Sequence, residues 1–193
     1  TRSICDWSSD VCSSDLVTGE VIGTVPQSTT EQVQATVDSA RMAQAAWAAR
    51  RTNERAAIIK KWAALLWEDQ QNAMRVIRDE TGKNDTGAFL EIVVTDAYAM
   101  YYAQHGPRIL KPKRRSPAFP LLQHGRVYYK PHGVVGYITP WNYPFALAFM
   151  DIVPALIAGN SIVIKPSEIT PYSVLYGVDL LHKAGVPKDV AQV

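Results

Sequence analysis

Two tetrapeptides combine side chains that could bind a polar ligand. Thr139-Pro-Trp-Asn142 offers an amide and an indole, and Lys165-Pro-Ser-Glu168 offers an ammonium and a carboxylate. Asn142 also has a structural interpretation, because asparagine is a favoured helix N-cap and Pro144 suits the first turn. The second tetrapeptide could likewise be a solvated turn before a helix that Thr170 caps. Both interpretations remain open from the residue types alone.

The elements around these tetrapeptides predict a parallel βαβα unit. Gly133–Ile138 and Ser161–Ile164 are apolar runs typical of buried parallel strands, and the predicted helices cover Tyr143–Ala158 and Pro171–Lys183. Right-handed crossovers would place both tetrapeptides at the carboxyl ends of adjacent strands, where such sheets bind ligands. We therefore expect them to share one crevice. The dinucleotide fingerprint GxGxxG is absent, since the only nearby glycine pair has another spacing and begins the strand.

The first half of the chain is predicted to be largely helical. A strand over 20–25 leads to a capping box at Ser28–Glu31, a second helix begins near Asn53, and a third over 69–80 ends at Gly82. Apolar residues recur at helical spacing, which favours core packing over a ligand site. The expected core positions are Val33, Val37, Ala40 and Trp47, then Ile58, Trp62, Leu65 and Leu66, and in a fourth helix Leu90, Val94, Ala97, Tyr98 and Tyr101.

Residues 105–120 interrupt the helical pattern with four prolines and the basic run Lys111–Arg115. Two strand-like runs about His124-Gly125 follow, so residues 108–131 are predicted to form an exposed connection and an extended arm that serves oligomerisation. A nucleic-acid site is disfavoured, because the basic run lacks interleaved aromatics and the chain balances 20 Lys and Arg against 18 Asp and Glu.

The composition excludes several other classes of protein. Apolar residues make up 47% of the 193 positions and charged residues 20%, which is typical of a globular chain. The most apolar stretch, Phe145–Ala158, is too short for a membrane span and contains Asp151 and Pro154. The four histidines lack metal-ligand spacing, so no metal site is predicted. The absence of a secretory signal and of any cysteine after Cys12 favours the cytoplasm.

Both ends of the sequence are interpreted as artificial. Residues 1–16 are rich in Ser and Asp, repeat Ser-Ser-Asp and lack any helical or strand period. We expect an adapter-derived, disordered segment that contains both cysteines, Cys5 and Cys12, and we begin the folded unit at residue 17. The chain starts with Thr1 rather than Met and stops at Val193 directly after a helix and a turn, which indicates a fragment.

Three sequence blocks together resemble the NAD(P)-dependent aldehyde dehydrogenases. They are GVVGYITPWNYP at 133–144, PALIAGN at 154–160 and IKPSEITP at 164–171. The resemblance extends upstream to about Val17 and covers less than half of the family's length. It implies an α/β fold class: the amino-terminal part of the aldehyde dehydrogenase fold, in which a helical segment precedes the first strands of an incomplete Rossmann-like parallel sheet. Residues 17–193 would be a partial NAD(P)-binding domain.

The resemblance also implies roles for particular residues. The amide of Asn142 would donate to the oxyanion that forms when a cysteine thiolate attacks the aldehyde. Lys165 and Glu168 would hydrogen-bond the adenosine ribose, and because a carboxylate repels a 2′-phosphate, NAD is favoured with NADP as the alternative. The full set of implied cofactor contacts is Ile138, Thr139, Pro140, Trp141, Asn142, Lys165, Pro166, Ser167 and Glu168.

Substrate preference and activity follow from the same resemblance. Tyr143, Leu147 and Met150 match substrate-lining positions, and since all three are uncharged, an apolar or aromatic aldehyde is favoured over succinate semialdehyde. The catalytic cysteine and the general-base glutamate would lie after Val193, so the chain as given is expected to be inactive and its open sheet edge to favour aggregation. The complete protein would be a homo-oligomer with no nucleic-acid or membrane partner. The alternative hypothesis is a non-catalytic nucleotide-binding or protein-interaction module.

Overall fold

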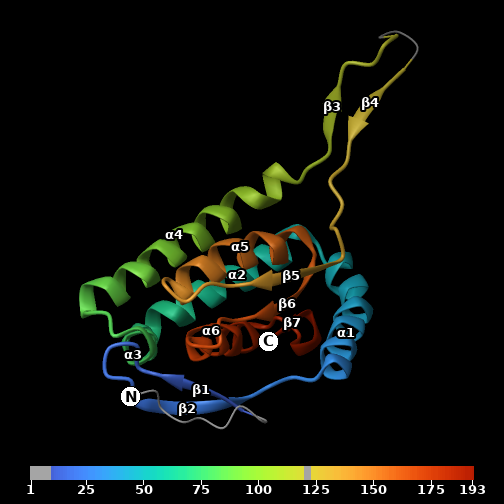
Figure 1. Cartoon of the computed structure of the whole chain (residues 1–193). Coiled ribbons are helices and arrows are strands. Elements are labelled where there is room, and N and C mark those ends of the chain that lie inside the picture. The colour runs from blue at the N-terminus through green and yellow to red at the C-terminus, as the bar shows by residue number, and fades with distance from the viewer. Residues whose placement is uncertain (1–9, 120–122) are drawn as a thin grey trace.

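The computed structural model describes residues 10–119 and 123–193. A hairpin and four helices come first, a second hairpin projects away from the body, and an alternating α/β segment completes the chain (Figure 1). In chain order the elements are β1 (Asp10–Ser14), β2 (Val21–Pro26), α1 (Thr30–Ala49), α2 (Thr52–Glu68), α3 (Gln70–Thr81), α4 (Asp85–Ile109), β3 (Lys113–Arg115), β4 (Gly125–Val127), β5 (Val134–Ile138), α5 (Pro144–Ala158), β6 (Ser161–Lys165), α6 (Pro171–Ala184), a 3-10 turn (Lys188–Val190) and β7 (Ala191–Gln192).

The predicted parallel unit is confirmed. Strands β5, β6 and β7 pair in parallel in that order, with Ile138 opposite Lys165 at the carboxyl ends. The Thr139 amide donates to the Lys165 carbonyl at 3.1 Å, so the two tetrapeptides begin side by side as expected. The prediction that both strands are buried on both faces is wrong for β5. None of its residues is fully buried, and Gly136 and Ile138, on the same face, are exposed, Ile138 to 85%.

The core lies among α2, α4, α5 and α6. Trp62 is fully buried, contacts the rings of Phe145 and Phe149, and donates from its indole nitrogen to the Gly177 carbonyl at 3.0 Å. A Cβ atom on Gly177 would lie 2.2 Å from the Phe149 ring. Glycine at this position therefore permits the close packing of α6 against α5.

The buried face of α4 differs from the predicted stripe. Leu90, Tyr98 and Tyr101 are 41–52% exposed, Ala97 is exposed and Val94 is half-buried. The buried face is formed instead by smaller or polar side chains, namely Ala88, Glu91, Ile92, Thr95, Ala99, Ala103 and Gly106. Small side chains allow neighbouring helices to approach closely, so in this helix the largest apolar residues indicate the wrong face. The predicted core residue Val33 in α1 is likewise 49% exposed.

Residues 1–16 were expected to be disordered, and this is wrong for Asp10–Ser14. These residues form β1, which pairs antiparallel with β2, and the buried Ser13 hydroxyl donates to the Ile169 carbonyl at 3.4 Å. Residues 1–9 of the segment, Cys5 among them, lie outside the described residues. The hairpin explains the error, because a five-residue strand paired with β2 needs no long periodic pattern of its own.

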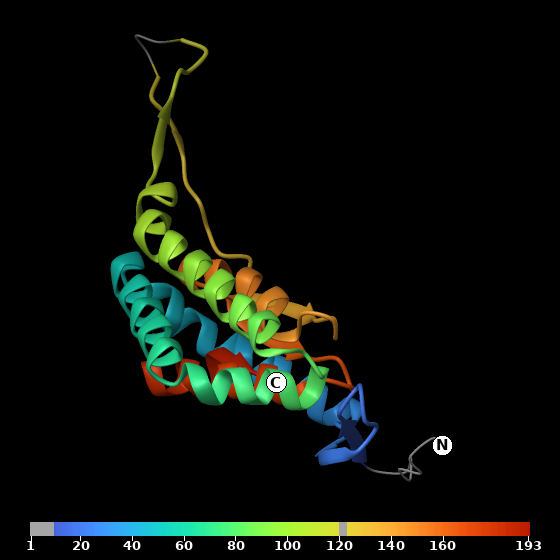
Figure 2. The ribbon, with the colours of Figure 1, turned by 90° about the vertical axis from the view of Figure 1, so that its left-hand side faces the viewer.

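The arm is an antiparallel hairpin, and its strands differ from the predicted runs about His124-Gly125. Lys113–Arg115 pairs with Gly125–Val127, so the basic run forms one strand and His124-Gly125 is not the turn. The predicted first run begins at residue 121, and its residues 121 and 122 lie outside the described residues. From a second direction the hairpin again extends away from the helices (Figure 2). Within residues 10–119 and 123–193, no helix is both long and apolar enough to cross a membrane.

Candidate functional site

A cavity of about 660 Å³ lies beside the Lys165–Glu168 loop. All four residues of this loop line it, and Leu175 of α6 and Val193 contribute to its walls. A second wall comes from the end of β2, from the connection to α1 and from the first turns of α1, which provide Thr24, Val25, Pro26, Gln27, Ser28, Val33 and Thr36. No motif in the sequence marks this wall, and only the fold brings it to the loop. Its position explains why Val33 is exposed.

Lys165 and Glu168 form an ion pair at this cavity. The Lys165 hydrogen bond holds the pKa of the Glu168 carboxyl below its ordinary value, so Glu168 is ionised at neutral pH. Lys165 Nζ also donates to the Pro166 carbonyl at 3.3 Å. More than half of each side chain is exposed, so a ligand can reach both. Hydroxyl groups of such a ligand could accept a hydrogen bond from the Lys165 ammonium and donate one to the Glu168 carboxylate.

The first tetrapeptide lies at the end of β5 and does not line the cavity. Ile138, Pro140, Trp141 and Asn142 are exposed, whereas Thr139 is buried and its hydroxyl has no hydrogen-bond partner among the described residues. The structure thus brings the two predicted loops together through their backbones. It separates the predicted cofactor residues into a group that lines the cavity, 165–168, and a group that does not, 138–142.

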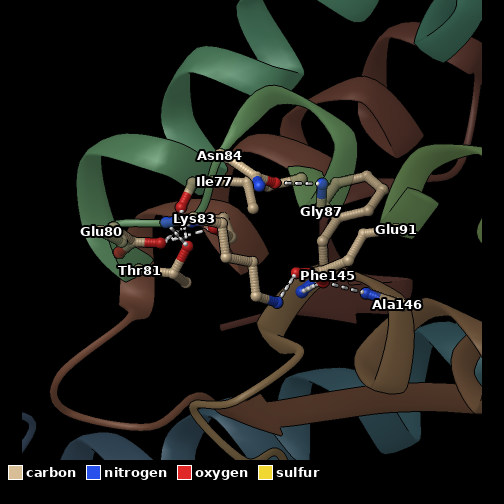
Figure 3. Close-up of polar contacts among 10 residues, drawn as sticks. Ile77, Glu80, Thr81, Lys83, Asn84, Gly87, Glu91, Phe145 and Ala146 are labelled. Atoms are coloured by element: carbon tan, nitrogen blue, oxygen red, sulfur yellow. Dashed lines mark hydrogen bonds and ion pairs between the residues drawn. The ribbon is translucent and has the colours of Figure 1, made fainter. Parts of the chain in front are cut away.

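Asn142 does not cap α5. The N-cap position belongs to Tyr143, whose side chain makes no capping hydrogen bond. The cap comes from Glu91 in α4, whose Oε2 accepts from the amides of Phe145 at 3.1 Å and Ala146 at 3.0 Å (Figure 3). Of the two interpretations of Asn142, the structure therefore removes the capping one and leaves an exposed amide directly before the helix.

A second buried carboxylate caps α6 in the same way. Thr170 occupies the predicted N-cap position, but its hydroxyl makes no capping bond and has no partner among the described residues. Glu80 of α3 accepts instead from the Ser173 amide at 2.8 Å, from the Ser173 hydroxyl at 2.5 Å and from the Tyr172 amide. Burial raises the pKa of the Glu80 carboxyl above its ordinary value.

Neither glutamate was predicted as a cap from the sequence, although the sequence contains a signal for both. Glu80 follows the buried Ala73 and Ile77 at helical spacing, and Glu91 similarly follows the buried Ala88. A charged residue in register with an apolar stripe must find a polar partner inside the fold. The partner here is the orphan amide set at the start of a helix from the other half of the chain.

The proposed substrate-lining residues follow one side of α5 and its approach. Tyr143 and Leu147 are 44% and 41% exposed, and Met150 is half-buried. The Lys83 ammonium lies over the Tyr143 ring, 3.8 Å from its centroid. These side chains offer an uncharged surface beside the exposed Asn142.

A parallel βαβ unit with a cavity at the carboxyl end of one of its strands, here β6, is typical of nucleotide-binding α/β proteins. The sequence profile described as "Aldehyde dehydrogenase family" matches residues 7–193. The chain therefore belongs to the aldehyde dehydrogenase family.

Individual relatives agree with this assignment. A putative succinate-semialdehyde dehydrogenase [NADP(+)] of Mycolicibacterium smegmatis is 42% identical over 179 residues, which cover 93% of this chain and 35% of that protein. Among solved structures, a succinate-semialdehyde dehydrogenase from Burkholderia pseudomallei matches with a TM-score of 0.90 at 33% identity, covering 97% of this chain and 39% of that one. A NAD-dependent benzaldehyde dehydrogenase from Corynebacterium glutamicum matches with a TM-score of 0.88 at 32% identity, covering 95% and 40%. The chain spans little more than a third of the length of these relatives.

Proposed function

We propose that this chain is the amino-terminal part of an enzyme that oxidises an aldehyde to a carboxylic acid with NAD or NADP. The observation that carries the proposal is the exposed Asn142 side chain two residues before α5. It is not needed as a helix cap, because Glu91 accepts hydrogen bonds from the first amides of that helix. Similarity to dehydrogenases of semialdehydes and of benzaldehyde supports this assignment.

The cavity residues fit the adenosine part of a nicotinamide cofactor. Val25, Pro26 and Val33 offer apolar contact for a base, and Lys165 and Glu168 offer a donor and an acceptor for ribose hydroxyls. An ionised Glu168 would repel a 2′-phosphate, so we favour NAD over NADP. When bound, the cofactor supplies the acceptor for a hydride.

Asn142 would stabilise negative charge on the substrate oxygen twice. A cysteine thiolate adds to the carbonyl carbon, and the carbonyl electron pair moves to the oxygen, where the Asn142 amide donates a hydrogen bond. Loss of hydride from the carbon leaves a thioester. Water, deprotonated by a glutamate, then adds to the thioester, the second oxyanion forms, and cleavage of the carbon–sulfur bond releases the acid and the thiolate. We assign the thiolate and the base to sequence outside this chain, so the 193 residues alone are expected to be inactive.

We also propose an apolar or aromatic aldehyde as substrate, since Tyr143, Leu147 and Met150 carry no charge that could pair with a carboxylate. The complete protein is proposed to be a cytoplasmic homo-oligomer in which the β3–β4 hairpin takes part in assembly. The projection of this hairpin from the body supports that role (Figure 2). A direct comparison of kcat/KM for benzaldehyde and for succinate semialdehyde tests the substrate, and a preference for succinate semialdehyde would overturn it.

Substitution of Asn142 tests the proposed reaction. In the complete protein, Asn142→Ala should lower kcat for aldehyde-dependent NADH formation by about 10²–10³-fold, because one preorganised donor to the oxyanion is lost. Asn53→Ala, which changes an exposed asparagine in α2, is the matched control. Equal activities of the two variants would contradict the role of Asn142.

A further inference from the structure

Lys83 and Glu91 form an ion pair inside the molecule, close to the loop that contains Asn142. The Glu91 side chain is fully buried and the Lys83 side chain is only 18% exposed. Lys83 lies in the short connection between α3 and α4. Its side chain extends toward the carboxylate of Glu91, a residue of α4 whose side chain reaches the start of α5 (Figure 3). A buried carboxylate needs a compensating charge or several hydrogen-bond donors, and Glu91 has both.

The pair contacts the chain directly after Asn142. Lys83 places its ammonium over the ring of Tyr143, the next residue, and Glu91 binds the amides of Phe145 and Ala146 in the first turn of α5. An ammonium 3.8 Å from a ring centroid is well inside the range of a cation–π contact. Together the two side chains hold the backbone and the aromatic ring that immediately follow the proposed oxyanion donor.

The cap on α5 does not by itself require a lysine. A neutral glutamine at position 91 could accept from the same two amides, because an amide oxygen is also an acceptor. The carboxylate present there brings a full negative charge close to the loop that holds Asn142, and only a nearby cation cancels it. In the proposed reaction negative charge develops on an oxygen bound to Asn142, so an uncompensated carboxylate would oppose that step.

We propose that Lys83 is a positioning residue for the oxidation of aldehydes. Its ammonium neutralises the charge of Glu91 and holds the ring of Tyr143 in place. The loop that carries Asn142 therefore keeps a fixed shape and has no uncompensated negative charge beside it when the oxyanion forms. This inference rests on the proposed function. It means that residues of the helical half of the chain set the electrostatic environment of the proposed oxyanion site. Lys83 itself touches neither the substrate nor the cofactor in this scheme.

A double-mutant cycle in the complete protein tests the inference. Lys83→Met should lower kcat by about 10–100-fold, which corresponds to the usual coupling between directly interacting residues. Lys83→Met combined with Glu91→Gln should recover most of this loss, because the double variant keeps an acceptor for the two amides and removes the charge. Lys183→Met, which breaks an exposed ion pair with Asp179, is the matched control and should leave kcat unchanged. The KM for NAD should be similar in all variants, since the cavity loop is not altered.

A result in which the double variant is no more active than Lys83→Met would overturn the inference, as would a Lys83→Met loss no larger than that of Lys183→Met. Amide hydrogen exchange in the complete protein, which does not depend on catalysis, separates this outcome from failure of the proposed function. Lys83→Met should speed exchange at Phe145 and Ala146 at least several-fold and the double variant should restore slow exchange. If the complete protein does not oxidise aldehydes, the proposed function fails, and unchanged exchange in Lys83→Met would then also reject the positioning role.

Discussion

The first turns of α5 and α6 are both capped by a buried glutamate, but the charge of that glutamate is stabilised differently at each helix. Each helix begins with a proline, lacks a capping side chain of its own and receives a buried glutamate from the helical half of the chain. Glu91 at α5 is paired with Lys83, whereas Glu80 at α6 is held by the amides of Tyr172 and Ser173 and by the Ser173 hydroxyl. The same cap therefore works with an ion pair in one place and with neutral donors in the other.

This difference follows from what each carboxylate does in the folded chain. Three neutral donors stabilise Glu80, yet burial still raises its pKa, so its charged form is disfavoured in the folded state. Lys83 gives Glu91 a full counter-charge. The comparison teaches that the α5 cap should depend on a particular lysine, and that the α6 cap should depend on pH.

The largest expected effect on stability comes from removal of the lysine. Lys83→Met should lower the free energy of unfolding by about 3–5 kcal/mol, because it leaves a fully buried carboxylate without its counter-charge. Urea unfolding followed by tryptophan fluorescence measures the loss, with the exposed Lys60→Met as control. A loss below about 1 kcal/mol would mean that Glu91 does not need its ion pair.

Removal of the second cap should have a smaller effect. Glu80→Leu leaves the amides of Tyr172 and Ser173 and the Ser173 hydroxyl without an acceptor, which should lower the free energy of unfolding by about 1–3 kcal/mol. The exposed Glu68→Leu serves as control. If Glu80→Leu proved as damaging as Lys83→Met, the distinction between the two caps would be lost.

The pH dependence sharpens the comparison further. The pKa of Glu80 is raised in the folded chain, so as the pH rises above the ordinary value of 4.5 the unfolded chain releases this proton first. The unfolding free energy should then fall, with a slope of at most about 1.4 kcal/mol per pH unit, until the pH passes the raised pKa. Urea titrations of the unsubstituted chain and of Glu80→Gln over this range provide the difference, and equal slopes would contradict the raised pKa.

The smallest effect is expected at the exposed pair beside the cavity. Lys165→Met should change the free energy of unfolding by no more than about 1 kcal/mol, because both partners are more than half exposed and water screens them. The same variant should weaken nucleotide binding, measured by titration calorimetry with NAD, since the cavity loses its donor. A large loss of stability without a change in binding would identify Lys165 as a structural residue.

Local sequence patterns predicted the elements of the α/β segment well. Two apolar strands and two helices that begin with a proline follow from short-range rules, as does Gly82 at the end of α3 in the helical half. The adjacency of Thr139 and Lys165 follows from the parallel pairing of two successive strands. The predictions failed where distant segments decide the outcome. The buried face of α4 depends on which neighbours it packs against, and the β2 to α1 wall of the cavity becomes part of a site only after the chain has folded.

The close contact between Gly177 and Phe149 has a consequence for ligand affinity. Since no methyl group fits between α5 and α6 at this point, the two helices are held at a single spacing, and so are the loops that precede them. A molecule that spans both loops meets a site whose parts already have their final separation. It therefore loses little affinity to ordering the protein, and a side chain at position 177 would weaken binding although it touches no ligand.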